Sequence, residues 1–125
     1  MNYDDIDRLL NSLKKTKFRG SFHLNNKMKL FVKEKGIDKI RSDAYELISK
    51  RIAIANPVND GKQTPMKQTH PVFIAQHATG TCCRSCLERI HHISKGKVLT
   101  NDEINYIIEV ITRWIIEEVY AWRKD

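Results

Sequence analysis

The C-terminal quarter of the 125-residue chain carries the pattern that most restricts the fold. Glu103 follows Thr100 at the spacing of a helix capping box, in which each side chain binds the other residue's backbone amide. Apolar residues then recur every three or four positions, as on the buried face of an amphipathic helix. We therefore expect a helix from Asn101 to about Trp122 as the central core element, with the apolar stripe Ile104, Ile107, Ile108, Ile111, Trp114, Ile115, Val119 and Trp122.

Weaker versions of this pattern upstream predict a mainly α fold. Helices are expected over residues 3–15, 27–35 and 38–52, then from Pro71, and over residues 82–93. Asn25 or Asn26 is expected to cap the helix over 27–35, and Thr81 the helix over 82–93. Residues 17–24 alternate aromatic and polar side chains, so we expect a short strand or an extended arm there. At this length the chain makes one domain, 1–125, of about four to six helices.

One long polar segment, residues 56–71, interrupts the helical pattern. It contains all three prolines of the chain and an Asp60-Gly61 turn signal. A structureless loop of this length is uncommon in a compact domain unless it is functional or disordered. Because it leads directly into the segment richest in cysteine and histidine, we interpret it as a site-forming loop.

All three cysteines and four of the five histidines fall within residues 70–92. Cys83 and Cys86 have the Cys-x-x-Cys spacing of zinc sites, since residues three apart at a helix start can point at one ion. His77 precedes Gly80, where a turn could fold its ring back toward the cysteines. The predicted ligand set for zinc is therefore Cys83, Cys86, His77 and Cys82.

The same cluster permits two other interpretations. A cysteine at a helix N-terminus has a lowered pKa and raised nucleophilicity, and a histidine could act as its base, so His70, His77 and Cys83 are candidate catalytic residues. Free cysteine is also a common small buried residue with no chemical role. The sequence leaves the metal site, the reactive thiol and simple burial open.

The net charge is +7, from 22 Lys and Arg against 15 Asp and Glu. This excess suits a nucleic acid or another polyanion as partner, although a solvated lysine-rich surface gives the same count. The N-terminus lacks the apolar stretch of a secretion signal, and no run approaches the roughly 18 apolar residues of a membrane span. We expect a cytoplasmic protein with reduced thiols and no membrane partner.

The runs NDGKQTPM, HPVFIAQHATGTCCRSCL and LTNDEINYIIEVITRWI together strongly resemble the bacterial and archaeal family known as domain of unknown function (DUF) 4186. The likeness covers about residues 17–118, which leaves residues 1–16 as an N-terminal helix outside the family core. Thr69 and Ile90 stand where members typically have glycine and tryptophan. The family has no described activity, so the resemblance implies site positions without a mechanism: Lys62, Gln63, His70, Gln76, His77, Cys82, Cys83, Arg84, Cys86 and His91.

Two hypotheses follow. In the first, the chain is a zinc-binding module whose basic surface contacts nucleic acid or another polyanion. In the second, it is an enzyme with a cysteine and histidine site, in which Arg84 and Lys62 bind an anionic substrate. The candidate substrate-binding or anion-binding side chains are Lys62, Gln63, Gln76 and Arg84.

Overall fold

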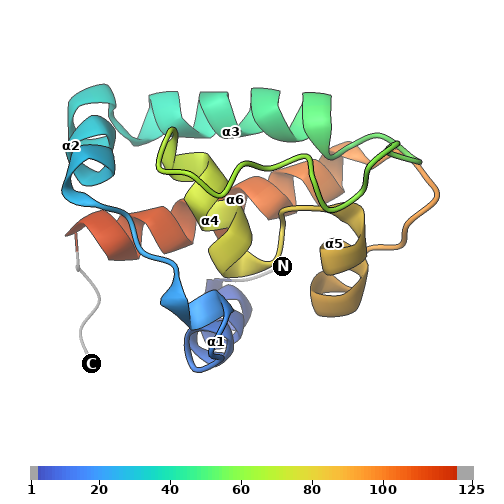
Figure 1. Ribbon diagram of the computed structural model, residues 1–125, viewed down its shortest axis with the longest axis horizontal. Helices are drawn as coiled ribbons and strands as arrows, with labels where there is room; N and C mark the ends of the chain where they lie inside the picture. The colour runs from blue at the N-terminus through green and yellow to red at the C-terminus, as the bar shows by residue number, and fades with distance from the viewer. Residues whose placement is uncertain (1–2, 121–125) are drawn as a thin grey trace.

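The computed structural model describes residues 3–120, and every regular element among them is helical (Figure 1). The mainly α prediction is therefore confirmed, whereas Trp122 lies outside the described residues. The elements are α1 Tyr3–Lys14, the short 3₁₀ helix η1 Arg19–Ser21, α2 Asn26–Lys35, α3 Ile37–Arg51, α4 Pro71–Thr79, α5 Arg84–His91 and α6 Asn101–Tyr120.

Helix α6 is the element on which the others pack. Its capping box forms as predicted: the Thr100 amide donates to Glu103 Oε1 at 2.9 Å, and the Glu103 amide donates to Thr100 Oγ1 at 3.1 Å. Helix α3 runs beside α6 in the opposite direction, and α4 packs against both (Figure 1). The predicted stripe is buried from Ile104 to Val119. No described helix is both long enough and apolar enough to cross a bilayer.

Helix α4 is enclosed by its neighbours, since all nine of its residues are buried. It begins at Pro71, where the His70 ring caps it by accepting from the Val72 amide at 3.1 Å. It ends at Gly80, which has the left-handed backbone conformation (φ 74°). The cysteine segment follows at once, so the buried helix fixes where that segment starts.

The segment expected as a strand or arm contains η1 followed by extended residues up to Asn25, the observed cap of α2. No strand forms within residues 3–120. Because η1 packs against both α1 and α4, it carries Arg19 to the C-terminal end of α4.

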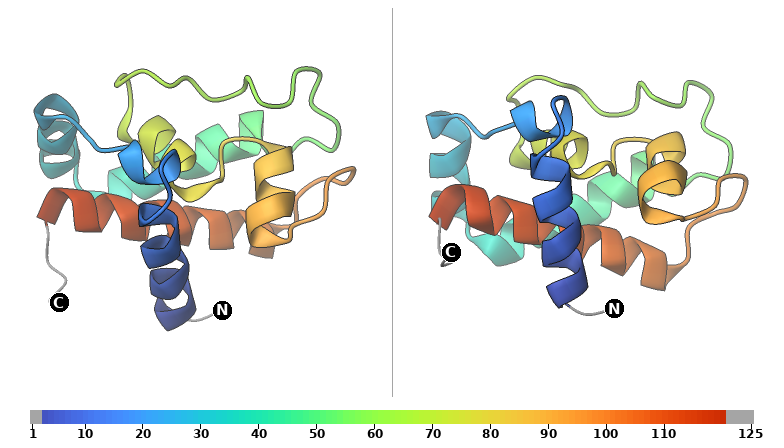
Figure 2. Two further views of the ribbon diagram at one scale, coloured as in Figure 1. Left: turned by 60° about the horizontal axis from the view of Figure 1, so that its bottom comes forward. Right: turned by 90° about the horizontal axis from the view of Figure 1, so that it is seen from below.

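The loop between α3 and α4 runs along one side of the molecule, past α4 and α5 (Figure 2). It is bonded to several elements rather than free. Gln68 Nε2 donates to the His23 carbonyl at 2.8 Å, and Thr64 Oγ1 donates to the Cys82 carbonyl at 2.8 Å. The loop therefore touches both the arm and the cysteine turn.

Candidate metal centre

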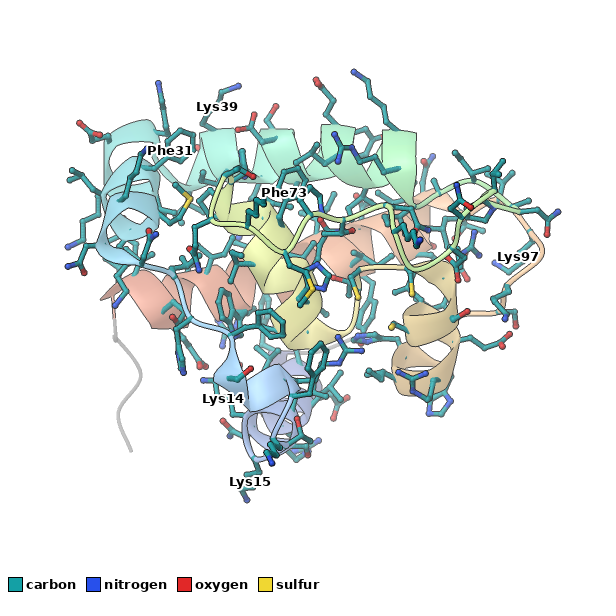
Figure 3. All side chains as sticks on the ribbon, viewed as in Figure 1. Lys14, Lys15, Phe31, Lys39, Phe73 and Lys97 are labelled. Atoms are coloured by element: carbon teal, nitrogen blue, oxygen red, sulfur yellow. The ribbon has the colours of Figure 1, made fainter. Side chains whose placement is uncertain are left out.

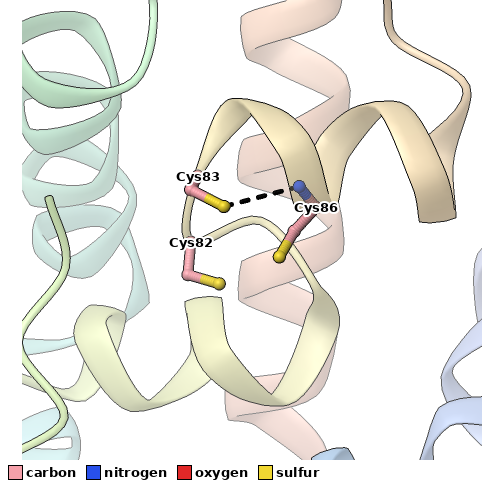
Figure 4. A group of neighbouring side chains, drawn as sticks. All are labelled: Cys82, Cys83 and Cys86. Carbon is pink, nitrogen blue, oxygen red and sulfur yellow. Dashed lines mark hydrogen bonds between the residues drawn. The ribbon is translucent and has the colours of Figure 1, made fainter. Parts of the chain in front are cut away.

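Cys82 and Cys83 lie on the turn that joins α4 to α5, and Cys86 lies in the first turn of α5. Their Sγ atoms are all within 4.8 Å of one another (Figure 4). Each of the three residues is buried. Within residues 3–120, these three cysteines form the group of potential metal ligands whose atoms are close enough to bind one ion. The structure thus gathers the sulfur atoms, although they come from only five consecutive positions.

Helix α5 begins two residues later than the sequence predicted, and Thr81 is not its cap. Cys83 caps it instead: its extended backbone (φ −161°, ψ 168°) lets Sγ accept from the Cys86 amide at 3.4 Å. The Thr81 hydroxyl meets the Thr79 hydroxyl at 3.1 Å. Because the Cys83 thiol accepts from the Cys86 amide, its sulfur also lies near the sulfur of Cys86.

Buried polar contacts hold the turn in this shape. Gln76 Nε2 donates to the Thr81 carbonyl at 3.1 Å, and Thr64 Oγ1 donates to the carbonyl of Cys82. Two features favour glycine at position 80 over other residues. Its φ is positive, and a Cβ there would lie 2.4 Å from Ile90 Cδ1.

Arg19 is the site residue that sequence reasoning missed. The residue is 8% exposed, and its guanidinium donates to the His77 carbonyl at 2.7 Å, to Cys86 Sγ at 3.2 Å and to Cys82 Sγ at 3.7 Å. Arg89 reaches Cys86 Sγ from the exposed side at 3.8 Å. Arg19 precedes the cysteines by more than 60 positions, and its local sequence carries no signal that links it to them.

The sulfurs and Arg19 redistribute charge within the cluster. Hydrogen bonds from the thiols of Cys82 and Cys83, and then from Arg19, hold the pKa of Cys86 well below its ordinary value despite burial. Hydrogen bonding with Cys83 and Cys86, together with burial, raises the pKa of Cys82. Of the three cysteines, Cys86 is therefore the one whose thiol loses its proton most readily.

His77 is close to this turn in sequence but does not join the sulfur group. Its Nε2 lies 3.0 Å from the Thr64 carbonyl oxygen and 3.2 Å from that of Pro65. Both partners are acceptors, so Nε2 carries the proton. The ring also stacks on Phe22, with centroids 5.5 Å apart. His77 contributes to the site through its backbone carbonyl, which accepts a hydrogen bond from Arg19.

The other histidines of the segment lie elsewhere. His70 is at the opposite end of α4, where Nε2 contacts Asp43 Oδ2 at 3.0 Å, and its ring packs between Phe31 and Phe73, which Figure 3 labels. His91 lies between the Tyr106 hydroxyl and the Thr79 carbonyl, each at 2.8 Å. Within residues 3–120, the structure therefore brings no histidine ring into the group formed by the three sulfurs.

The predicted anion-binding side chains are also dispersed. Arg84 is fully buried, and its Nη atoms donate to the carbonyls of Ile54 at 2.7 Å and Ser94 at 2.8 Å. Gln76 is buried on the cysteine turn, and Gln63 Nε2 donates within the loop to Asp60 Oδ1 at 2.7 Å. Lys62 is exposed. These four side chains do not form a substrate site with the sulfurs.

These features define a small all-α protein with a buried three-cysteine turn between two helices. Its sequence matches the family model described as Domain of unknown function (DUF4186) over residues 7–116. The chain belongs to this family, as the resemblance predicted, and the match begins inside α1. No solved structure matches the chain.

Proposed function

We propose that Cys82, Cys83 and Cys86 bind a metal ion as thiolates, with zinc as the expected ion, in a protein of the reducing cytoplasm. The observation that supports this most directly is the gathering of three sulfurs within 4.8 Å on one turn. Tetrahedral zinc, with Zn–S bonds of about 2.3 Å, holds its sulfurs about 3.8 Å apart. Side-chain adjustments of about an ångström therefore bring the cysteines to ligand positions.

Arg19 gives the site a charge that suits a divalent ion. Three thiolates and a divalent cation leave one negative charge, which a buried guanidinium neutralises. Arg19 can only donate hydrogen bonds, and it already faces two of the sulfurs, so it would stabilise thiolates more than thiols. Soft thiolate ligands select zinc and related ions over magnesium or calcium.

Three protein ligands leave one coordination position for another donor. His77 was predicted to fill it, but its ring would have to leave the carbonyls of Thr64 and Pro65. We propose instead that water or a bound ligand takes this position, as in zinc sites that remain open for chemistry or exchange.

Metal analysis of the protein purified under reducing conditions tests the proposal. We expect stoichiometric zinc in the wild type, strong loss in Cys82→Ser, Cys83→Ser and Cys86→Ser, and retention in His77→Gln. His23→Gln is the matched control, because it removes an exposed histidine whose ring contacts Glu118. Wild-type protein that neither carries zinc nor takes it up when supplied would refute the metal centre.

We also propose that the basic surface contacts nucleic acid or another polyanion, which is supported by the net charge of +7. Binding to a labelled oligonucleotide should weaken steeply as salt rises, because each neutralised phosphate releases counterions. Absence of binding at low salt would remove this part of the proposal without affecting the metal centre.

A reactive thiol is the second candidate function, and the contact between Arg19 and Cys86 Sγ favours it. Alkylation of the metal-free protein at neutral pH should then modify Cys86 faster than Cys82 or Cys83. Equal and slow modification of all three would eliminate this candidate.

A further inference from the structure

Cys83 and Cys86 lie on one helical turn at the Cys-x-x-Cys spacing of disulfide-forming pairs. Cys83 is the capping residue of α5, and Cys86 is the third residue of the helix. Their sulfurs lie within 4.8 Å of each other, and the Cys86 amide already donates to Cys83 Sγ at 3.4 Å (Figure 4). A disulfide holds its two sulfurs about 2.05 Å apart, so rotation of the two side chains has to close a gap of less than about 3 Å.

Cys82 is less suited to pair with either of the other cysteines. Adjacent residues rarely have the Cα separation and the Cβ directions that a disulfide needs, which disfavours a bridge from Cys82 to Cys83. A bridge from Cys82 to Cys86 would start outside the helix. The Cys82 carbonyl there accepts from Thr64 Oγ1 at 2.8 Å, and its sulfur accepts from Arg19 at 3.7 Å. The pair that needs the least rearrangement is therefore Cys83 and Cys86.

Cys86 is the sulfur at which an oxidant would react first. Two guanidinium groups donate to its Sγ atom, Arg19 at 3.2 Å and Arg89 at 3.8 Å. Such donors stabilise the thiolate, which is the nucleophilic form of a cysteine. Cys86 is also the least buried of the three cysteines, and its neighbour Arg89 is exposed. A small hydroperoxide therefore approaches Cys86 from the solvent side.

We propose that a hydroperoxide converts Cys83 and Cys86 to a reversible disulfide, and that this disulfide and a bound metal ion exclude each other. The Cys86 thiolate attacks a peroxide oxygen, the O–O bond breaks, and the departing alkoxide takes up the proton that Cys86 had lost and becomes an alcohol. The Cys83 thiol then attacks the sulfur of the Cys86 sulfenic acid, so that the S–S bond forms and hydroxide leaves with the Cys83 proton as water. Two thiols thus lose two electrons to one hydroperoxide, and an external dithiol reverses the change.

The exclusion of metal follows from the form of sulfur that a metal ion binds. A metal ion binds thiolates, and a disulfide has none, so oxidation removes two of the three proposed ligands and releases the ion. This consequence rests on the proposed metal centre, whereas the formation of the disulfide does not depend on it.

Peptide mapping of the metal-free protein tests the pair. After treatment with equimolar hydrogen peroxide at neutral pH, the remaining thiols are alkylated and the protein is digested with trypsin, which cuts after Arg84. The cut separates Cys86, on peptide 85–89, from the peptide that carries Cys82 and Cys83. We expect a bond that dithiothreitol breaks to join the two peptides, with the alkyl group on Cys82. The bond should persist in Cys82→Ser, the matched control, and be lost in Cys83→Ser.

Zinc-loaded wild-type protein provides the second arm. Hydrogen peroxide should release zinc as the peptides become joined, and dithiothreitol should restore binding. Joined wild-type peptides with the alkyl group on Cys83 would overturn the pair, and separate peptides in oxidised wild type would overturn the disulfide while the metal centre stands on its own zinc analysis. Zinc that stays bound to protein with joined peptides would overturn the exclusion. Joined peptides in a protein that takes up no zinc would support the disulfide and remove the metal centre.

Discussion

Replacing Arg19 with methionine tests two proposed roles of this residue: stabilising the fold and strengthening metal binding. Methionine keeps an unbranched apolar stem but removes the charge and every donor. The change leaves the His77 carbonyl without its partner at 2.7 Å and removes the contacts with Cys86 Sγ and Cys82 Sγ. Because Arg19 is 8% exposed, water replaces these bonds poorly.

The expected losses follow from those contacts. A buried hydrogen bond from a charged donor contributes about 1.5–3 kcal/mol, and part of this is recovered by the apolar stem, so the metal-free protein should lose about 2 kcal/mol. The bonds to sulfur strengthen only when the sulfurs are thiolates. Losing two of them should lower zinc affinity by roughly tenfold to a hundredfold.

Urea denaturation of the metal-free protein and competition with a zinc chelator measure the two effects. Arg89→Met is the control, since it makes the same chemical change at an exposed residue whose contact with Cys86 Sγ is 3.8 Å. That variant should change stability by less than about 0.5 kcal/mol. If Arg19→Met binds zinc as tightly as Arg89→Met does, the charge argument for a divalent ion is wrong.

Three further predictions concern the elements around the site. Thr100→Ala should cost about 1 kcal/mol in urea denaturation, because Glu103 loses the oxygen that caps its amide; an unchanged midpoint would contradict this. Burial lowers the pKa of His91 from 6.5, so its contribution to stability is present above pH 6.5 and is lost as pH falls toward the lower folded value. The pH dependence should flatten in His91→Gln, and an equal slope in both proteins would contradict the assignment. Gly80→Ala should lower the melting temperature and loosen zinc binding together, since the new Cβ meets Ile90 at 2.4 Å; separate responses would show that the turn does not shape the site.

Local signals account for most of the fold that could be predicted. The caps at Asn25 and Thr100 each depend on residues three positions apart, so the sequence contains both partners. The start of α5 was misplaced because threonine is ordinarily the better cap. The helix starts after Cys83 instead, because Cys83 has the extended backbone of a capping residue, which depends on packing rather than on local preference.

The sequence revealed only part of the site, because one of its residues reaches the cysteines through tertiary packing. The sulfurs are neighbours in sequence, whereas Arg19 reaches them through the packing of η1 on α4. Arg84 has partners that its local sequence does not reveal. It was expected to bind an anionic substrate, and in the structure its Nη atoms donate to the carbonyls of Ile54 and Ser94. Long-range partners of a charged side chain cannot be inferred from its immediate neighbours.

The first turn of α5 gives a physical reason to expect metal binding to influence the long loop between α3 and α4. Thr64 holds the Cys82 carbonyl from one side, and Asp60 holds the amides of Arg84 and Ser85 from the other. Both anchors belong to the same loop, which also meets the arm through Gln68. A metal ion on the sulfurs would fix the backbone whose amides Asp60 binds, so it should also order the loop that carries Asp60 and Thr64. Zinc loading should therefore slow amide hydrogen exchange in residues 56–71, and equal exchange rates with and without zinc would contradict this coupling.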